Sequence, residues 1–385
     1  MDKGQQTDVA ILDFSKAFDT VPHPRLLQKL EGYGVRGPLL TWMKSFLCNR
    51  HMRVIVEGEF SSEVVVDSGV PQGTVLGPLL FLVHINDLPD CVKSSVRLFA
   101  DDCLLYRTIS CLADHLALQA DLYALEKWAS LNGMSFNAKK CYILSISKGP
   151  PKSYFYYQLN STILQGVDNN PYLGLLISKD LKWGTHIDKI SKKASATLGF
   201  ITRNTRKCPQ SCRKTAYISL VRSTLEYGST IWDPYLQKDI TKLEKIQRRA
   251  ARFIKQDYHS KEPGSMTAML KELELPPLED RRKENRLCLM YKISNDLVPP
   301  IPSDEYLTRV RDKRNIQKNR KYNDYVTTNY VERHQRLNTN CYTVPKTETD
   351  TYKNSFFPRT ICDWNGLKDT NFASIDLFRK SLQYQ

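Results

Sequence analysis

The first half of the chain alternates between two hydrophobic patterns. Residues 8–15 are an almost unbroken apolar run, typical of a buried strand, and residues 95–107 are two apolar runs around a polar tip, typical of a hairpin. Residues 115–133 instead repeat Leu at helical spacing and end at a glycine. Strands and helices mixed in this way predict an α+β domain, with a small antiparallel sheet backed by helices.

Gly and Pro separate the other predicted elements of this half. They are helices at 25–34 and 37–50, two strand-like runs around a Gly58 turn within 52–69, a Gly/Pro-broken loop opening into an apolar helix within 68–89, and strands at 141–147 and 172–178.

From about residue 180 the chain becomes helical and basic, most clearly at 186–204 and 239–256. Residues 307–325 are charged and poorly periodic, which predicts a flexible or extended arm. Aromatic residues near the C-terminus predict that this end folds back in part: Phe356, Phe357, Trp364, Phe372 and Phe378.

The Pro150–Pro151 pair marks a predicted seam in the chain. We therefore expect an α+β region at 1–150, a mainly helical region at 151–257, and a basic, partly flexible region at 258–385.

Charge is distributed unevenly along the 385 residues, whose net charge is +15. Residues 1–147 hold 14 Lys and Arg against 16 Asp and Glu, whereas the remainder holds 42 against 25. A basic excess of this size favours a polyanionic partner, most simply nucleic acid. A solvated basic surface is the alternative explanation of the same charge.

The cysteines and the apolar stretches indicate where in the cell the protein is expected. The ten cysteines include no C-x-x-C pair and no Cys/His knot, so we interpret them as reduced intracellular thiols rather than disulfides or a zinc site. The N-terminus is polar, and the longest apolar stretch, 75–85, is too short to span a bilayer. We expect an intracellular protein, nuclear or cytoplasmic, that is neither secreted nor membrane-bound.

Three aspartates stand where strands are predicted to end. Asp13 ends the first strand, and Asp101 and Asp102 form the tip of the hairpin. If the two elements pair, three carboxylates converge and repel each other unless a divalent cation neutralises them. Hard oxygen ligands favour Mg²⁺, and two such ions about 4 Å apart are a standard device for nucleotidyl transfer. Ordinary turn or helix-cap roles remain the alternative for each aspartate alone.

Five segments occur in an order that resembles a known family: LDFSKAFDTV, SGVPQGTVLGPLLF, LFADD, NAKKC and YLGLLIS. Together they resemble the palm of reverse transcriptases of non-LTR (LINE-type) retrotransposons, with Jockey-type elements nearest in character. The resemblance is strong over residues 5–180 and looser through 225–254, which is similar to the thumb of these proteins. It implies an RNA-directed DNA polymerase with a right-hand palm at 1–150, the palm end, primer grip and helical thumb at 151–257, and a basic region at 258–385.

The resemblance also implies roles for residues around the metal and the nucleotide. Asp13 and Asp101 match the main metal ligands, Asp102 matches their partner, and Phe14 supplies a backbone carbonyl. Phe18 matches the steric gate that selects deoxynucleotides, with a core aromatic as the alternative. Gln72 and Gly73 match the Pro-Gln-Gly motif at the incoming nucleotide, with a plain turn as the alternative.

Two further matches concern the pyrophosphate and the primer. Lys140 matches the lysine that protonates the leaving pyrophosphate, with Lys139 as its rival and a solvated lysine as the bland alternative. Leu173 and Gly174 match the primer-grip turn.

The basic half then has a physical role, which is to follow a template–primer backbone with little regard to sequence. A solvated helix face is again the alternative. The candidate contacts are Arg203, Arg206, Lys207, Arg213, Lys245, Arg248, Arg249 and Arg252.

The family pattern differs from this chain at its start, because Met1 lies close to Asp13. Family members normally carry fingers, and often an endonuclease, upstream on the same chain. We expect either a 5′-truncated element copy or a reading frame begun at an internal Met.

Two main hypotheses follow from the sequence. One is a Mg²⁺-dependent reverse transcriptase, with Mn²⁺ as an alternative ion, that uses an RNA template, a DNA primer and deoxynucleoside triphosphates. The other is an inactive remnant that only binds RNA or RNA/DNA hybrid. A polymerase of the same palm that copies DNA, or no template, is a third class.

Overall fold

The computed structural model describes every residue except 1, 261, 311–340 and 383–385. The chain forms two compact units, each described here by itself. The N-terminal unit comprises Lys3–Tyr172 and Ile177–Leu181; the C-terminal unit comprises Asp2, Leu173–Leu176 and Lys182–Gln385. The division therefore lies further along the chain than Pro150–Pro151.

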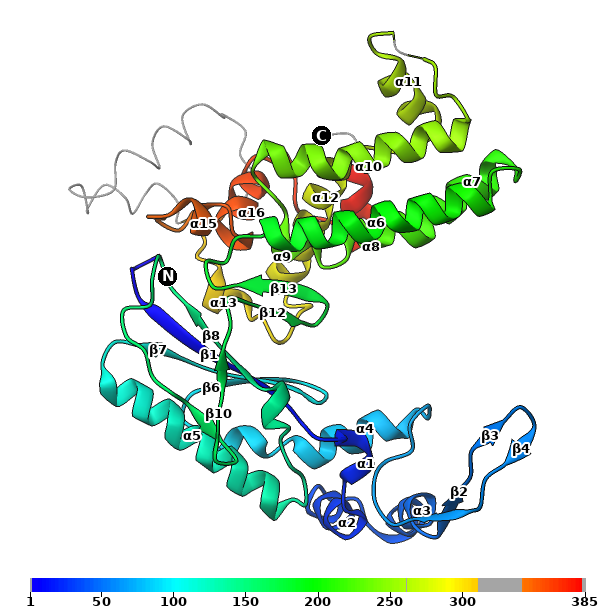
Figure 1. The fold of residues 1–385 in the computed structure, drawn as a ribbon. Coiled ribbons are helices and arrows are strands. Elements are labelled where there is room, and N and C mark those ends of the chain that lie inside the picture. Colours follow the sequence, from blue (N-terminus) through cyan, green and yellow to red (C-terminus); the bar gives the residue numbers. More distant parts are fainter. Residues whose placement is uncertain (1, 261, 311–340, 383–385) are drawn as a thin grey trace, which may run out of the picture. The chain divides into compact units, whose positions relative to one another are not determined.

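A five-stranded sheet with the order β11-β8-β1-β7-β6 forms the centre of the N-terminal unit (Figure 1). All neighbours pair antiparallel except β11 and β8. Its strands are β1 (Gln6–Asp13), β6 (Ser95–Phe99), β7 (Asp102–Ile109), β8 (Tyr142–Ile146) and β11 (Gln165–Gly166). The predicted pairing of the first strand with the hairpin is confirmed.

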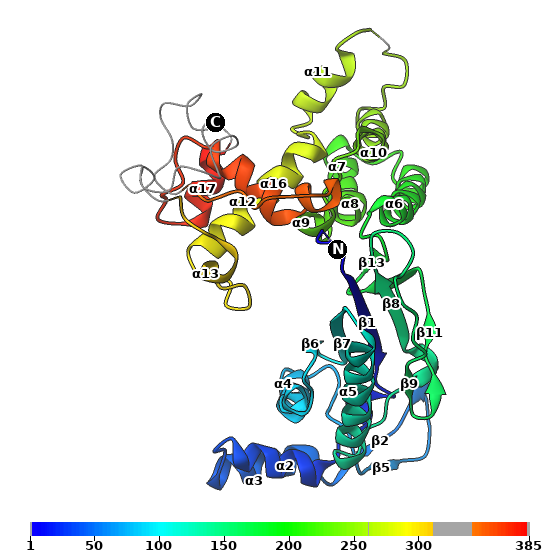
Figure 2. The ribbon, with the colours of Figure 1, turned by 90° about the vertical axis from the view of Figure 1, so that its left-hand side faces the viewer.

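The helices of this unit are α1 (Ala17–Thr20), α2 (His23–Gly32), α3 (Gly37–Leu47), α4 (Leu76–Ile85) and α5 (Leu112–Leu131). Helix α5 packs against β7 of the sheet, whereas α2 packs against α3 and α4. The core joins Leu12 of β1 and Leu105 of β7 to Leu118 and Leu122 of α5, and Figure 2 shows α5 running along the sheet. This confirms the predicted α+β class. However, β1 is buried only at alternate positions, so its apolar run does not mean burial on both faces.

A network of buried polar groups explains why residues 151–172 belong to the N-terminal unit. The Tyr157 hydroxyl donates to Asp8 Oδ2 at 2.8 Å and lies 2.7 Å from His115 Nδ1. The other nitrogen of this imidazole lies 2.7 Å from Ser153 Oγ. Because Asp8, His115 and Tyr157 are almost fully buried, breaking this network would strand polar groups away from water.

The segment around Gly58 differs from the two strands predicted there. It forms a ribbon of two short pairs, β2 (Arg50–Met52) with β5 (Val64–Val66) and β3 (Ile55–Val56) with β4 (Glu59–Phe60). The predicted strand at 172–178 also divides, into β12 (Asn169–Tyr172) and β13 (Leu175–Ser178), joined by a two-residue turn. A further pair is β9 (Gln158–Leu159) with β10 (Thr162–Ile163).

The C-terminal unit is mainly helical, as predicted. Its helices are α6 (Gly184–Asn204), α7 (Gln210–Ala216), a π-helical segment (Tyr217–Arg222), α8 (Ser223–Glu226), α9 (Ser229–Trp232), α10 (Gln237–Lys255), α11 (Ser265–Glu272), α12 (Leu278–Ser294), α13 (Ser303–Tyr306), α15 (Asp350–Lys353), α16 (Phe356–Asn365) and α17 (Ile375–Ser381). The predicted helices at 186–204 and 239–256 correspond to α6 and α10.

Two apolar clusters stabilise the C-terminal unit. One lies between α6 and α10, and the other buries Trp364 and Phe378 against α12. The prediction that the C-terminal end folds back is therefore confirmed. Most of the predicted arm at 307–325 lies outside the described residues. No helix in the described part of the chain has the length and apolar character needed to cross a bilayer.

Candidate active site at one end of the central sheet

Asp13 and Asp102 lie directly opposite each other, on β1 and β7. Opposed residues of antiparallel strands project from the same face of a sheet. The preceding pair, Leu12 and Cys103, is buried in the core. The two aspartates therefore project from the opposite face, where β1 is only half-buried.

The hairpin tip holds the third aspartate. Phe99 pairs with Asp102, which leaves Ala100 and Asp101 as a two-residue turn. Ala100 has a φ of 50°, a left-handed conformation that costs an alanine about 1 kcal/mol more than a glycine. The turn thus carries local strain at the point where it presents Asp101 beside the Asp13–Asp102 pair.

The three carboxylates influence each other electrostatically. Burial raises the pKa of Asp102 above its usual range, and the charges of Asp101 and Asp13 raise it further. Among the residues that the structure describes, no three acidic, His or Cys side chains form a ready metal cluster. The repulsion of Asp102 by Asp101 and Asp13 is what favours a cation here.

The cysteines next to the carboxylates restrict the donor set to oxygen. Burial raises the pKa of Cys103 to about 12 and that of Cys141 to about 11, so both thiols stay protonated at neutral pH. Hard carboxylate oxygens without thiolate suit Mg²⁺ or Mn²⁺ better than zinc. The residues present therefore fit a divalent cation of that class.

A short 3₁₀ turn brings a lysine to this site. Asn137 N donates to the carbonyl of Asp13 at 2.8 Å, and Lys140 N donates to the carbonyl of Asn137 at 2.8 Å. This anchoring leaves Lys140 Nζ 3.7 Å from Asp13 Oδ2, with an exposed side chain. Of the two lysines weighed in the sequence, Lys140 is thus the one with an ion-pair contact to the carboxylates.

The aromatic residues after Asp13 have different surroundings. Phe14 is buried and stacks on Phe136 with ring centroids 4.2 Å apart. Phe18 is half-buried and stacks on Phe81 of α4 at 4.4 Å. The predicted gate residue therefore rests against a helix that follows the Pro-Gln-Gly segment.

The Pro-Gln-Gly segment docks onto the turn that holds Phe18. Val70 N donates to the carbonyl of Phe18 at 2.8 Å, and Gln72 Nε2 donates to Asp19 Oδ1 at 3.3 Å. A Cβ at Gly69 would lie 2.8 Å from the backbone of Asp19, so glycine is required there by close approach. Gly73 has open space around its Cα and a φ of 79°, so the turn conformation is what requires glycine there.

The sequence analysis missed one residue beside the carboxylates. Tyr172, at the end of β12, has a pKa raised first by burial and then by the charges of Asp102 and Cys103. Its only signal in the sequence is its place at the start of YLGLLIS, which gave no reason to expect it near Asp102.

Comparison with known proteins identifies the part of the chain that carries this site. Residues 1–177 match the family described as "Reverse transcriptase (RNA-dependent DNA polymerase)". Residues 1–177 are a reverse transcriptase domain. The resemblance to enzymes of LINE-type mobile elements is confirmed, and enzymes of this family generally use divalent metals.

Two relatives that the chain resembles come from Drosophila melanogaster. The RNA-directed DNA polymerase from mobile element jockey is 29% identical over 286 residues, which are 71% of this chain and 30% of that protein. The probable RNA-directed DNA polymerase from transposon X-element is 28% identical over 267 residues, 66% of this chain and 29% of that protein. The chain thus matches under a third of the length of either relative.

Solved structures similar to the chain include telomerases. Telomerase from Candida albicans, in complex with a TWJ fragment of telomeric RNA, has a TM-score of 0.40 and 12% identity, and the match covers 79% of this chain and 52% of that one.

The remaining predicted residues lie in the C-terminal unit. Leu173 and Gly174 form the turn between β12 and β13, both with positive φ. Arg203 and Arg206 are exposed at the end of α6, and Arg248 and Arg249 are exposed on α10.

Arg213, also proposed from the sequence as a backbone contact, is buried. Its Nε and Nη2 donate to the carbonyl of Ile254 at 3.0 and 2.7 Å. That proposal is therefore corrected, because this guanidinium stabilises the end of α10 rather than facing a ligand.

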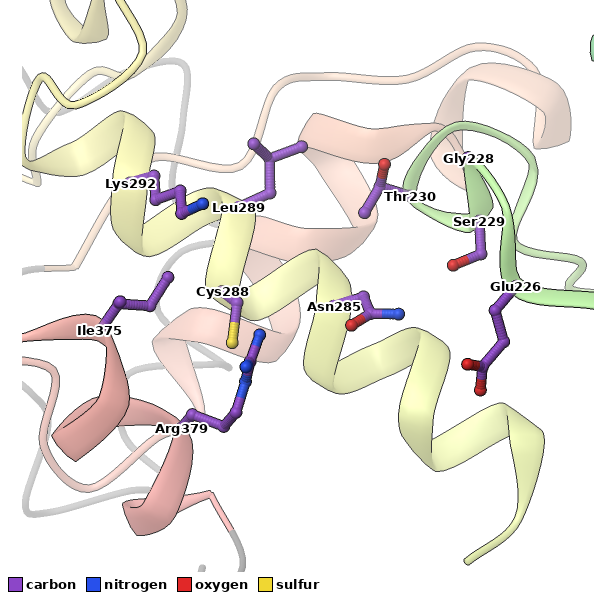
Figure 3. A pocket seen from close by; sticks show the side chains of 10 residues that line it. All are labelled: Glu226, Gly228, Ser229, Thr230, Asn285, Cys288, Leu289, Lys292, Ile375 and Arg379. Atoms are coloured by element: carbon purple, nitrogen blue, oxygen red, sulfur yellow. The ribbon is translucent and has the colours of Figure 1, made fainter. Parts of the chain in front are cut away.

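A separate cavity of about 230 Å³ lies between α9, α12 and α17 (Figure 3). Two of its charged groups are paired: Arg379 points toward Cys288 and contacts Glu284 at 3.1 Å, and Glu226 accepts from Arg281. Burial raises the pKa of Cys288.

Proposed function

We propose that this chain is an RNA-directed DNA polymerase that transfers nucleotides onto a primer 3′-hydroxyl. The observation that carries the proposal is the register of Asp13 against Asp102 within a reverse transcriptase domain. Adjacent carboxylates whose nearby lysine is exposed are costly for stability alone, and they suit a reaction that brings its own cations.

The carboxylates of Asp13, Asp101 and Asp102 would hold two Mg²⁺ ions, with Mn²⁺ as a substitute. Bound ions would supply the positive charge that favours an ionised primer hydroxyl and a departing pyrophosphate. Lys140, 3.7 Å from Asp13, is placed to donate a proton to the pyrophosphate. The protonated thiols of Cys103 and Cys141 leave this charge to the carboxylates.

Two neighbouring features support deoxynucleotide selection. Two contacts fix Phe18: its ring stacks on Phe81, and its backbone carbonyl accepts a hydrogen bond from Val70 N. A fixed ring of this kind would exclude a 2′-hydroxyl. Gln72 and Gly73, which follow Val70 in the chain, would face the nucleotide.

The nucleic-acid partners we propose are an RNA template, a DNA primer and the hybrid that they form. The exposed guanidinium groups of Arg203, Arg206, Arg248 and Arg249 would contact its phosphates.

Primer extension by the full chain tests the proposal. The assay contains an RNA template, an annealed DNA primer, deoxynucleotides and Mg²⁺. We expect the wild-type protein to extend the primer. In Asp102→Asn the extension rate should fall by at least about 100-fold, because the substitution removes a negative charge that stabilises the transition state. Asp90→Asn, an exposed aspartate outside the site, is the matched control.

A negative result would be informative. If folded wild-type protein binds the hybrid in low salt but extends no primer, the chain is a binding remnant and the enzymatic proposal fails. If Asp102→Asn extends as well as Asp90→Asn, the activity does not come from this site.

A further inference from the structure

The turn between β12 and β13 is strained and therefore needs support. Leu173 has a φ of 47° and Gly174 a φ of 81°. A non-glycine residue in this region costs about 1 kcal/mol or more and persists only where its surroundings hold it. That support comes from the LEYGSTIWDP sequence at 225–234.

Tyr227 holds this turn directly, within the C-terminal unit. Its hydroxyl donates to the carbonyl of Leu173 at 3.1 Å. A Cβ at position 174 would lie 3.0 Å from Tyr227 Cε1, so the glycine lets the turn lie close against the ring. The next residue, Gly228, approaches Leu175 equally closely, with 3.0 Å between a Cβ built there and Leu175 Cδ2.

The backbone of Tyr227 is itself anchored in the core. Buried Trp232 donates from its indole Nε1 to the carbonyl of Tyr227 at 2.8 Å. Buried His186 accepts from Leu176 N at 3.2 Å and meets Trp232 edge to face, with centroids 5.4 Å apart. The turn is thus connected to the helical core through two routes, one on each side of Gly174.

Tyr227 nevertheless remains 60% exposed. A tyrosine needed only for the core would be buried, because burial of the ring is the source of its stabilising effect. Here the ring contributes little burial, and its contacts concentrate on one strained turn. That distribution points to a role in setting the conformation of the turn.

We propose that Tyr227 is a positioning residue that holds the Leu173–Gly174 turn in the conformation that receives the primer terminus. This inference rests on the proposed function and on the primer-grip role that the family resemblance predicts for that turn. Tyr227 acts through the turn and takes no part in the chemistry. The hydroxyl fixes the Leu173 carbonyl, and the ring limits how far Gly174 can move.

Two substitutions separate these contributions. Tyr227→Phe removes the hydrogen bond and keeps the ring, so we expect kcat for primer extension to fall roughly 2- to 10-fold. Tyr227→Ala removes both, and we expect a fall of roughly 10- to 100-fold, since small misplacements of a reacting group are costly. The KM for deoxynucleotides should change little in either variant. Tyr235→Phe, another exposed tyrosine of the same unit, is the control.

A second readout does not depend on activity. A hybrid with 2-aminopurine at the primer 3′ end, bound without nucleotides, reports the stacking of the terminal base. We expect Tyr227→Ala to change this fluorescence while the overall affinity for hybrid and the melting temperature stay at wild-type values. Wild-type fluorescence and wild-type kcat in Tyr227→Ala would overturn the inference.

The two proposals fail in different ways. A wild-type chain that binds hybrid but extends no primer contradicts the enzymatic function. The 2-aminopurine fluorescence then still tests whether Tyr227 affects the position of the primer terminus. A fall in melting temperature that accounts for the whole loss of kcat in both variants would assign Tyr227 a structural role and also overturn the inference.

Discussion

Aspartates in the two units of this protein have opposite electrostatic surroundings. In the C-terminal unit, buried Asp233 accepts from Arg282 Nε at 2.7 Å and Arg286 Nε at 2.8 Å. In the N-terminal unit, half-buried Asp102 faces the carboxylates of Asp13 and Asp101, which raise its pKa after burial. The fold pairs Asp233 with two buried arginines, whereas the carboxylates around Asp102 have the exposed Lys140, 3.7 Å from Asp13 Oδ2. Carboxylates without a buried protein cation are the ones available to an external ion.

The arginines repeat the same contrast. Arg213 is buried and donates to backbone carbonyls, whereas Arg248 and Arg249 are exposed on α10. Residue type alone does not separate these roles. Burial separates them, because a buried guanidinium must satisfy its donors within the protein.

Removing the carboxylate of the neutralised site should have the largest effect on stability. We expect Asp233→Asn to lower the free energy of unfolding of the C-terminal unit by about 3–5 kcal/mol, because Arg282 and Arg286 stay buried without their counter-charge. Urea unfolding followed by tryptophan fluorescence measures this change.

The control for that prediction is Asp188→Asn, whose partner is Lys242 in an exposed ion pair. An exposed pair contributes about 1 kcal/mol at most. Equal losses in the two variants would remove the distinction between buried and exposed aspartates.

The contrast among arginines predicts a salt effect. In the double variant Arg248→Gln/Arg249→Gln, the slope of log affinity for hybrid against log salt should fall by about 1 to 2, because up to two phosphate contacts are lost. Fluorescence anisotropy between low and physiological salt measures it. The charge-matched variant Arg36→Gln/Lys44→Gln, on exposed positions of the N-terminal unit, should keep the wild-type slope. Identical slopes in all three proteins would mean that Arg248 and Arg249 face solvent and do not contact phosphates.

The smallest expected effect concerns the carboxylate left unneutralised. The folded-state pKa of Asp102 is raised, so its ionisation above that pKa destabilises the folded state, and this penalty disappears at lower pH. Asp102→Asn should therefore raise the melting temperature at pH 7, by about 2 °C, because the side chain is partly solvated. The difference from wild type should close as the pH falls through the pKa of Asp102.

Adding Mg²⁺ without nucleic acid sharpens this prediction. The ion should raise the melting temperature of the wild-type protein and leave that of Asp102→Asn nearly unchanged, because binding to the folded state alone is stabilising. Differential scanning fluorimetry at several pH values measures both effects, with Asp90→Asn as the control. A variant less stable than wild type at pH 7 would contradict the proposed repulsion.

Much of the fold was predictable from local sequence. The Leu spacing of 115–133 and its terminal glycine predict α5, and the polar tip between two apolar runs predicts the β6–β7 hairpin, because both patterns depend on residues close together in the chain. The elements that differed were short. The Gly58 ribbon and the β12–β13 turn depend on strand pairings that no periodic pattern in the sequence predicts.

The sequence by itself determined which residues are candidates for the chemistry. The order of five motifs can be recognised from the sequence alone. It predicts the three aspartates, Lys140 and the primer-grip turn as candidate site residues. Tyr227 lies outside these motifs, and Cys141 and Tyr172 lie inside them without a sign of their surroundings, because a cysteine or a tyrosine is common in cores.

Tertiary structure alone decided which of these groups meet. The register that opposes Asp13 to Asp102 joins strands far apart in the chain, and the two bonds to Ile254 determine that Arg213 is structural. A local pattern specifies an element, whereas burial and electrostatic pairing arise only when distant elements pack together.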